Sequence, residues 1–599
     1  MSASLPTPAE LTAERWRSAG RALVADAIAE FCYEELLDPL PQGAGRYRIR
    51  LPGHVEYRFT AKRGAYGSWF VVTGSVSRHA PGADQEADDA LRLVVDAREP
   101  LGLSGDGAGH LIRELNTALA ADVKRQAVGE LSASALADLS YEQLEARQAG
   151  RPRIAADPAR AAGCPTDGAR ARAAEPRPHT ALPWIAARRD LATYRAVPGL
   201  TPDKLYHAEL DSAVRANFTA KLTGRGLDPA AYWWLPTHPR QWDETILPLY
   251  TGQVADRLIV PLGDGPDAYL AQRSARIFAN ASAPRRRDVK LSQSFLDTLV
   301  WHGPPIERTL AAPSVTAWVQ GIARRDAFLS EVCRVALLGE VASVTVAHPV
   351  LDELPGIPPE YRELLGAVWR EPLAGALEPS ERARGLSCLL QADPDGRALL
   401  SELVARSGLR PRVWLGRLFG AVLPPLLHLL YQYGVVVSPR GESAVVVFDA
   451  RDIPIRLAVK DFVDEVSISA LPLPELDDLP GEVDAAVPRE LPDGLCRLVH
   501  AGVFIGCFRH LAEVAERQLG VRSEDFWRMA RAEIRAYQEV FPSLAKRFVT
   551  FDLVTERVDR LCLARDRGGL LVPGGCRKGF GCTEPVSHGD VLNPLYDPA

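Results

Sequence analysis

The first 150 residues combine two hydrophobic periods. Residues 9–38 carry apolar side chains at mostly helical spacing, with charged residues between them, which predicts an amphipathic helix. Four short alternating or apolar runs separated by Gly and Pro follow, and such runs are typical of an antiparallel sheet. They read RYRIRLPG, VEYRFTAKR, SWFVVTGSVSR and LRLVVDAR. Helical spacing returns from GHLIRELNTALAADVKRQAVGEL to about Ala149, so we expect an α+β domain over residues 1–150.

The pattern weakens between residues 150 and 183. Ala, Arg, Pro and Gly dominate there, which indicates a linker or an exposed functional loop. Residues 202–224 are expected to be helical. The following segment AYWWLPTHPRQWDETILPLY contains prolines that disfavour a long helix, so we expect a structured connection with aromatic walls. His238 in this segment is a candidate for contact with a ligand, and a structural histidine is the alternative.

A lone lysine stands in an alternating segment further along. In V-K-L-S-Q-S-F the apolar residues fall on one side of a probable strand and Lys290 falls on the other. Ser274 and Arg276 lie shortly upstream, so the stretch could offer two cations and a hydroxyl group to one polyphosphate. A basic hairpin on a solvated surface is the alternative explanation.

The last half of the chain predicts helices, then a hairpin, then helices. We expect residues 306–405 to be mainly helical, with a Pro-rich turn at 354–359. The apolar run PRVWLGRLFGAVLPPLLHLLYQYG indicates buried helices. In VVVSPRGESAVVVFD and IPIRLAVKDFVDEV, two β-branched runs flank the turn Asp449–Asp452, which predicts a hairpin. Residues 497–548 are again expected to be helical, most clearly in FWRMARAEIRAYQEVF.

Four charged residues fall at the strand ends or loops of this hairpin: Arg440, Glu442, Lys460 and Asp461. Asp461 closely follows the apolar run LAV. A carboxylate at the end of a buried strand is a candidate ligand for Mg²⁺, which prefers oxygen ligands and phosphate partners. A salt bridge to Lys460 or to a neighbouring arginine is the alternative.

Composition narrows the class of protein without defining it. The chain of 599 residues is long enough for two to four domains, and 70 Lys+Arg against 76 Asp+Glu give no basic field for nucleic acid or an anionic membrane. The N-terminus does not resemble a signal peptide, and no apolar run of about 18 residues occurs, so we expect a cytoplasmic protein. Only Cys576 and Cys582 lie close together, and their C-x5-C spacing favours two free thiols over a metal site.

Common catalytic signatures are missing, including the phosphate-binding P-loop, the dinucleotide fingerprint, the G-x-S-x-G elbow and H-E-x-x-H. Five other segments resemble, in order, motifs of the IucA/IucC family of NRPS-independent siderophore synthetases. YLAQRSARIFAN resembles its Ser-x-Arg-Thr nucleotide segment, and DVKLSQSFLDTLVWHG its Lys-Leu strand and Thr-x-x-x-Arg turn. LPTHPRQW is similar to the His-Pro-x-Gln-Trp element of the desferrioxamine-type branch, LAVKDFVDEV to the [RK]-D-F segment, and NPL at 593–595 to the family's ending.

The resemblance implies an α+β fold shaped like a cupped hand, with mixed antiparallel sheets and helices, usually in a homodimer. Its three parts would be a thumb over residues 1–150, fingers with the nucleotide-binding segments over 151–385, and a palm over 386–599. It also implies a reaction in which ATP, with Mg²⁺, activates a carboxylate as an acyl-adenylate that an amine or hydroxylamine then captures.

Residue by residue, the resemblance gives a candidate site. Ser274, Arg276, Lys290 and Asp461 match positions that serve the nucleotide and its metal. The catalytic candidates are Lys290, Arg276, Arg440 and His302. The candidates for ATP binding are Ser274, Arg276, Lys290, Arg170, Arg172, His238, Arg440 and Asp461. The candidates for metal binding are Asp461 and Glu442.

Several positions depart from the family pattern. The segment GCPTDGARAR at 163–172 lacks both histidines of the Gly-His-Pro-x-His-Pro-x-x-Lys-x-Arg motif. It has Cys164 and Asp167 near their places, and Arg170 and Arg172 in place of the basic pair. Each such change removes or alters a contact with phosphate or metal, and a lost charged partner typically costs about 2–5 kcal/mol when buried.

Three further departures lie in the other motifs. Ile277 replaces a threonine, His302 stands where an arginine is expected, and His-Gly-Gln-Asn reads Arg-Gly-Glu-Ser at residues 440–443. These changes keep three functions open. The first is a ligase of the siderophore-synthetase kind. The second is an acyl-transfer or condensation enzyme that works without ATP from a preactivated donor such as a thioester, and the third is a non-catalytic partner of a functional synthetase.

Overall fold

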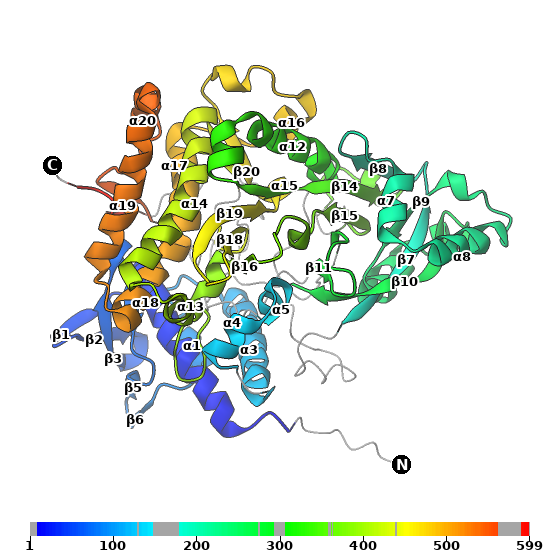
Figure 1. Cartoon of the computed structure of the whole chain (residues 1–599). Helices are drawn as coiled ribbons and strands as arrows, with labels where there is room; N and C mark the ends of the chain where they lie inside the picture. The colour runs from blue at the N-terminus through cyan, green and yellow to red at the C-terminus, as the bar shows by residue number, and fades with distance from the viewer. Residues whose placement is uncertain are drawn as a thin grey trace, which may run out of the picture.

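A computed structural model describes residues 9–128, 131–147, 179–272, 276–292, 306–357, 361, 363–437, 440–560 and 589–597. An N-terminal sheet with its helices lies beside the C-terminal helices, and a large sheet lies on the opposite side of the molecule (Figure 1). A smaller mixed sheet lies between them. The expected α+β class, with mixed antiparallel sheets and helices, is confirmed.

The N-terminal part is an antiparallel sheet covered by helices. Helix α1 buries the stripe that includes Leu23, Ala27 and Phe31, as its spacing predicts. Strand β3 is central and pairs with β2, β4 and β5. The elements are α1 (Ala13–Tyr33), β1 (Leu40–Gly43), β2 (Arg46–Leu51), β3 (Val55–Arg63), β4 (Trp69–Val71), β5 (Ser77–Ala80), β6 (Ala83–Glu86), α2 (Ala90–Asp96), α3 (Gly105–Val128), α4 (Ala133–Asp138) and α5 (Tyr141–Arg147).

One predicted strand is wrong: LRLVVDAR forms helix α2. The Asp89 carboxylate accepts hydrogen bonds from the backbone N–H groups of Leu91 and Arg92 at 2.9 and 3.0 Å, which caps the helix N-terminus. A short apolar run has no period that separates a strand from a buried helix, so the capping aspartate was the informative residue.

The large sheet has eight strands in the order β8-β14-β15-β12-β11-β10-β7-β9, and every neighbouring pair is antiparallel. Strand β7 begins at Thr180, so the end of the predicted linker is a strand. The elements of this part are β7 (Thr180–Arg188), β8 (Ala192–Ala196), α7 (Pro202–Glu209), α8 (Ser212–Thr223), β9 (Tyr232–Pro236), α9 (Pro239–Gln241), η4 (Trp242–Ile246), α10 (Leu247–Leu249), α11 (Thr251–Ala255), β10 (Ile259–Ala271), β11 (Ile277–Asn280), β12 (Asp288–Leu291), β14 (Glu340–Val346) and β15 (Gly366–Arg370).

The expectation that residues 306–405 are mainly helical is wrong. Helix α12 (Ile306–Arg325) is followed by β13 (Ala336–Leu338), β14, β15 and β16 (Arg382–Gly385). Strands β14 and β15 are buried almost throughout, and in β14 even the polar Glu340 and Ser343 are buried, so the side chains do not divide into a buried apolar face and an exposed polar face.

The C-terminal part contains the predicted hairpin. Strands β18 (Ala444–Phe448) and β19 (Pro454–Lys460) are antiparallel, and β13 and β16 complete a four-stranded sheet. The apolar run at 411–433 is one helix that contains both of its prolines. The other elements are α13 (Leu399–Ser407), α14 (Pro411–Tyr433), β17 (Val435–Val437), α15 (Phe462–Glu465), β20 (Val466–Ser469), α16 (Gly481–Ala486), β21 (Arg489–Glu490), α17 (Pro492–Val499), η11 (His500–Phe508), α18 (Arg509–Leu519), α19 (Ser523–Val540), α20 (Ala545–Thr550), β22 (Arg557–Asp559) and β23 (Asp590–Leu592).

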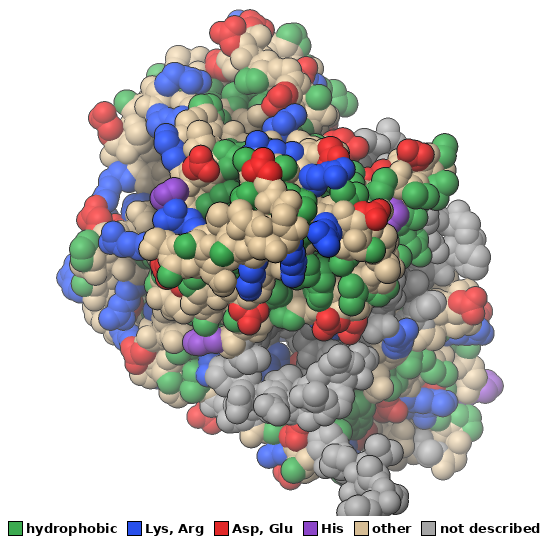
Figure 2. Space-filling model, turned by 90° about the vertical axis from the view of Figure 1, so that its right-hand side faces the viewer, with side chains coloured by type: hydrophobic (Ala, Val, Ile, Leu, Met, Phe, Trp, Pro, Cys, Tyr) green, Lys and Arg blue, Asp and Glu red, His purple; other side chains and the backbone are tan. Residues whose placement is uncertain are grey.

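Two large hydrophobic cores organise the described residues. One joins the N-terminal part to the C-terminal helices, and the other fills the side of the eight-stranded sheet that α7 and α8 cover. Two helical segments, Pro411–Tyr433 and Pro492–Leu519, are long and apolar enough to span a membrane, but 72% of each apolar window is buried inside the fold. Basic and acidic side chains are interspersed on the face shown in Figure 2, which agrees with the net charge of −6.

Candidate active site

The site is built on the side of β12 that faces away from the large core. Cross-strand partners share a face, and the register pairs Asp288 with Arg370, Val289 with Trp369 and Lys290 with Val368. Val289 and Trp369 belong to the core, so Asp288, Lys290 and Arg370 project from the opposite face. Lys290 is 7% exposed, and the solvated hairpin considered above is therefore wrong.

Arg370 joins this sheet to the end of the hairpin. Its guanidinium donates from Nη2 to Oδ2 of Asp288 at 2.7 Å and from Nη1 to Oδ1 of Asp461 at 2.9 Å. Burial opposes ionisation of Asp461, but Arg370, Lys460 and Lys290 outweigh it and lower the pKa of that carboxyl to about 2. Asp461 is therefore a carboxylate at neutral pH, and its ion pair is with an arginine 91 residues away.

Asp461 has an unusual backbone for a residue other than glycine. It follows β19 directly with φ 66° and ψ 57°, in the left-handed region, which costs about 1 kcal/mol. The next residue, Phe462, donates its backbone N–H to Oε2 of the buried Glu340 at 3.2 Å. This turn directs the chain from the buried strand into α15.

A second acidic group lies beside Asp461. Arg440 and Glu442 are in the loop before β18, and Nη1 of the half-exposed Arg440 is 3.7 Å from Oε1 of Glu465. Burial, with Asp461 and Glu442 nearby, raises the pKa of Glu465 to about 7, against the opposing effects of Arg440 and Ser443. The other oxygen, Oε2 of Glu465, is buried and has no hydrogen-bond partner among the described residues.

Helix α5 closes the site from the N-terminal side. The ammonium group of Lys460 donates to the hydroxyl of Tyr141 at 2.6 Å and lies 3.5 Å from Oε2 of Glu145. The thiol of Cys388 donates to Oε1 of the same glutamate at 3.1 Å. Burial raises the pKa of Tyr141, so its hydroxyl remains protonated.

The structure brings together only some of the predicted residues. Lys290, Asp461, Arg440 and Glu442 contribute to one polar cluster, since Lys290 and Glu442 act on the carboxyls of Asp461 and Glu465. Arg276 immediately precedes β11, and its carbonyl accepts from the N–H of Leu291 on β12. Six other predicted positions lie outside the described residues: Ser274, His302, Arg170, Arg172, Cys576 and Cys582. The departures at Cys164 and Asp167 lie there too.

His238 lies elsewhere. Its ring packs against Phe278, with centroids 5.5 Å apart, on the side of the sheet that carries the large core. Nδ1 of His238 accepts from the N–H of Arg240, which caps the short helix α9. Burial, helped by the charge of Arg240, lowers the pKa of His238 to about 4, so the ring is neutral. These contacts are those of a structural histidine, and a role in ATP binding stays a prediction.

Sequence reasoning missed Asp288, Arg370, Tyr141, Glu145 and Glu465. One signal was available, because extending the alternation of V-K-L backwards by one residue puts Asp288 on the face of Lys290. The others come from segments far apart in the chain, and no local pattern identifies them.

The chemistry of the donors fits a hard divalent cation. Asp461 is ionised, Glu442 lies nearby, and the buried Oε2 of Glu465 is an acceptor without a donor. Carboxylate oxygens are the ligands that Mg²⁺ prefers. No group of three His, Cys, Asp or Glu residues within the described ranges is already gathered as a metal site.

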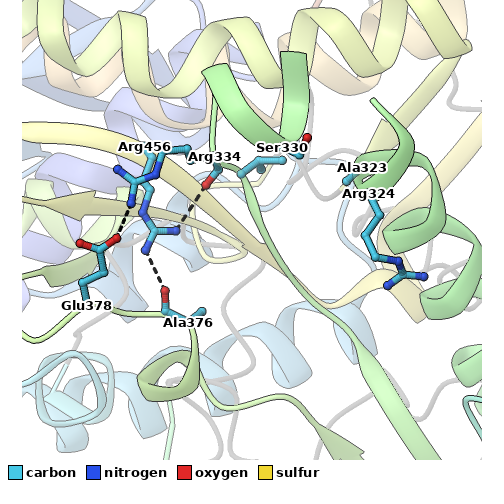
Figure 3. Close-up of a pocket in the computed structure, with 8 residues that line it drawn as sticks. Ala323, Arg324, Ser330, Arg334, Ala376, Glu378 and Arg456 are labelled. Carbon is cyan, nitrogen blue, oxygen red and sulfur yellow. Dashed lines mark hydrogen bonds and ion pairs between the residues drawn. The ribbon is translucent and has the colours of Figure 1, made fainter. Parts of the chain in front are cut away.

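A separate cavity of about 310 Å³ lies at the other end of β19 (Figure 3). Its lining includes Arg334, Arg456 and Glu378. Arg456 donates to carbonyl oxygens and to Glu381, while Arg334 is 2.6 Å from Glu378, so its arginine charges are matched by carboxylates. The side chain of Arg324 points away from this group (Figure 3). The hydrogen bonds and ion pair of Arg456 fix the start of β19 beside this cavity. The cavity is distinct from the polar cluster.

The fold is that of the siderophore synthetases. The family model described as "IucA / IucC family" matches residues 140–391, and one described as "Ferric iron reductase FhuF-like transporter" matches residues 412–568. The structure is similar to aerobactin synthetase IucC from Klebsiella pneumoniae, with a TM-score of 0.82, 28% identity, and coverage of 97% of this chain and 98% of that one. It also shares its fold with the petrobactin biosynthesis protein AsbB from Bacillus anthracis, at TM-score 0.84, 21% identity, and coverage of 98% and 97%.

Relatives identified by sequence align with this chain over nearly its whole length. The rhizobactin siderophore biosynthesis protein RhbF of Rhizobium meliloti is 33% identical over 98% of this chain and 97% of its own. Putrebactin synthase of a Shewanella species is 30% identical over 93% and 88%. The chain belongs to the IucA/IucC family, and the predicted class, a carboxylate–amine ligase of the siderophore-synthetase kind, is confirmed.

Proposed function

We propose that this protein uses ATP to convert a carboxylic acid into an acyl-adenylate, with release of pyrophosphate, and joins the acyl group to an amine, hydroxylamine or related nucleophile. The observation that carries the proposal is the charge chain Asp288, Arg370 and Asp461, with Lys290 on the same sheet face. Such a buried, hydrogen-bonded arrangement is preorganised, so it can stabilise developing charge without rearranging first.

Each described residue has a task in this proposal. Lys290 and Arg276 neutralise phosphate oxygens, and Arg440 supplies a cation at the more exposed edge of the cluster. Arg370 fixes the orientation of the Asp461 carboxylate through its 2.9 Å hydrogen bond. Asp461, with Glu442, would hold Mg²⁺, which supplies neutralisation of phosphate charge when bound. Holding the acid and the α-phosphate in line accounts for much of the expected acceleration.

The relatives support a place in siderophore assembly, because one of those named above is a siderophore biosynthesis protein and others are a putrebactin synthase and an aerobactin synthetase. We also propose a cytoplasmic homodimer, the three-part cupped-hand division, and membership of the desferrioxamine-type branch for which LPTHPRQW is the argument. Sedimentation of the purified protein tests the dimer.

The test of ATP use is pyrophosphate release with a panel of di- and tricarboxylic acids, diamines and hydroxylamines, with product mass measured in parallel. We expect ATP-dependent product from the wild type and a loss of at least about 100-fold in Asp461→Asn, because the amide cannot replace the charge that binds the cation. The control is Asp96→Asn. It removes a carboxylate that pairs with Arg78 and Tyr57 in the N-terminal sheet, and it should leave the rate within about twofold.

Two other outcomes would each favour a different function. Product that forms equally well without ATP and Mg²⁺ would favour acyl transfer from a preactivated donor. Absence of nucleotide binding by calorimetry, with stable co-purification with a functional synthetase, would favour a non-catalytic partner.

A further inference from the structure

A tight turn directly before β18 carries two of the residues that the proposed function uses. Arg440 and Glu442 lie in this turn, on either side of the buried Gly441. The carbonyl oxygen of Arg440 accepts from the backbone N–H groups of Ser443 at 3.0 Å and of Ala444 at 2.8 Å. Ala444 is the first residue of β18, so the backbone of the turn is fixed to the start of the strand.

The middle of the turn is tied to a second element, the short 3₁₀ helix η9 (Leu386–Leu390). The backbone N–H of Ser387 in this helix donates to the carbonyl oxygen of Gly441 at 2.9 Å. Helix η9 directly follows β16, the strand that pairs with β18. The hydrogen bond therefore extends the contact between these two strands beyond their paired residues.

Gly441 lies where a side chain would not fit easily. A Cβ atom there would be 3.2 Å from Cβ of Ser387 and 3.6 Å from Cβ of Cys507. A separation below 3.4 Å is tighter than an ordinary Cβ contact, so a side chain would move the turn or its neighbour by a few tenths of an ångström. The backbone of Gly441 is not in the left-handed region. The position therefore needs the absence of a side chain, and not a special backbone conformation.

The two neighbours of Gly441 are themselves fixed. Cys507 is 1% exposed and lies in the π-helix η11, beside the fully buried Phe508. Its thiol donates to the carbonyl oxygen of Leu386, the residue before Ser387, at 3.6 Å. Helices η9 and η11 are therefore joined to each other where both meet Gly441. π-Helical segments occur frequently at functional sites.

The position of this turn matters because it sets the positions of two charged groups. Nη1 of Arg440 is 3.7 Å from Oε1 of Glu465, and the arginine side chain is 49% exposed. A displacement at Gly441 passes to Arg440 and Glu442 through the covalent chain. A misplacement of about 1 Å can cost about 100-fold in rate, so a shift of a few tenths of an ångström should cost about 5- to 10-fold.

We propose that Gly441 is a positioning residue of the active site. Because it has no side chain, Ser387 and Cys507 can close on the turn and set where Arg440 and Glu442 meet the nucleotide. This inference rests on the proposed function and adds η9 and η11 to the elements that shape the site.

The experiment compares Gly441→Ala with the wild type in the full-length protein. Binding of ATP with Mg²⁺ is measured by calorimetry, and the KM values for ATP and for the carboxylate are measured by pyrophosphate release. We expect the dissociation constant and the KM for ATP to rise about 5- to 10-fold. The KM for the carboxylate should change less than about twofold, because the proposed function gives this turn no role in holding the acid.

A second substitution tests whether crowding is the cause. Ser387→Gly removes the nearer of the two Cβ atoms, so the double variant Gly441→Ala/Ser387→Gly should bind ATP within about twofold of Ser387→Gly alone. If Gly441→Ala does not fold, the double variant carries the test, because it should fold and bind ATP in that range. A double variant that fails to fold, or that binds ATP as weakly as Gly441→Ala, would overturn the inference.

Gly224→Ala is the matched control. A Cβ atom at Gly224 would lie 3.0 Å from the carbonyl oxygen of Ala220, at the end of α8 on the core side of the eight-stranded sheet. This variant should leave both KM values within about twofold of the wild type. If Gly441→Ala binds ATP as the wild type does, the turn is only structural and the inference is wrong. If the wild type itself binds no ATP with Mg²⁺, the proposed function fails and this inference fails with it.

Discussion

Glu465 shows, at the scale of single residues, how the site opposes ionisation of one of its own groups. Its pKa is raised to about 7 by burial and by the carboxylates nearby, whereas an unfolded chain would give a value near the ordinary 4.5. A raised pKa means that the folded protein holds a proton that the unfolded chain releases. This contribution to stability is complete below pH 4.5 and is lost as the pH rises through 7.

Replacing Glu465 with Gln should remove that pH dependence. We expect the free energy of unfolding of Glu465→Gln, relative to the wild type, to rise by up to about 3 kcal/mol between pH 5 and pH 8. Urea unfolding at four pH values measures it. Glu524→Gln is the control, because that side chain is 78% exposed. A difference from the wild type that is constant over the range would show that Glu465 is not the group that titrates.

Single residues also show what the sequence could and could not reveal. Lys290 and Asp461 could be identified because each ends or interrupts an apolar run. Arg370 could not, because GAVWR contains no feature that distinguishes its arginine from a surface arginine, and its partner Asp461 is 91 residues away. Chemistry that depends on pairing between distant strands leaves no trace in local spacing.

At the scale of elements, two helices end in the same way but in different surroundings. Gly434 follows α14 with φ 63°, and Gly520 follows α18 with φ 66°. A Cβ at Gly434 would lie 2.3 Å from Cδ1 of Leu473 and 3.0 Å from Cβ of Ser469, whereas nothing lies within 4 Å of one at Gly520. Both glycines have the left-handed backbone conformation, but only Gly434 is closely surrounded by other side chains.

Alanine at the two positions should therefore have different costs. Gly520→Ala should lower the free energy of unfolding by about 1 kcal/mol, which is the cost of the left-handed conformation. Gly434→Ala should cost at least about 2 kcal/mol more, because Leu473 must move within the core. Chemical denaturation measures both variants. Equal losses would mean that the backbone conformation alone requires glycine at Gly434.

Elements with a regular period were predictable, and buried strands were not. The amphipathic helices α1 and α19 and the hairpin β18–β19 follow from spacing and turn residues. Strands β14 and β15 did not, because residues on both of their faces are buried, polar Glu340 and Ser343 included, so polarity does not mark an exposed face. The helix α2 was mistaken for a strand for a different reason, because seven residues are too few to display a period.

At the scale of the whole molecule, the N-terminal part and the C-terminal helices share one hydrophobic core. Arg509 on α18 is 3% exposed, with its guanidinium 3.1 Å from the Glu30 carboxylate and 4.2 Å over the ring of Tyr33, both on α1. These contacts lie within the core that joins residues near position 20 to residues near position 550. Residues predicted for the thumb and residues predicted for the palm therefore contribute to one hydrophobic core, and the three-part division stays a prediction.

Arg509→Met should test this union. We expect a loss of about 1.5–3 kcal/mol, because the variant loses the charge-assisted hydrogen bond from the buried guanidinium to the partly exposed carboxylate of Glu30. Hydrogen exchange should increase in α1 and α18 together. Arg517→Met in the same helix is the control, since Arg517 forms an exposed pair with Glu513 worth well below 1 kcal/mol. Faster exchange in α18 alone would mean that the two ends unfold independently.

The link from Arg370 to Asp461 also has a consequence for synthesis on the ribosome. Asp461 is made 91 residues after Arg370, an interval of roughly 5–20 s at ordinary translation rates. Strand β13 must likewise wait for β19, its parallel partner. Until the hairpin emerges from the ribosome, Arg370 on the nascent eight-stranded sheet therefore lacks its partner Asp461, and the neighbouring strand β13 lacks its partner β19. Slow codons between β15 and β19 would lengthen the exposure of this intermediate, and chaperone demand should depend on that interval more than on total chain length.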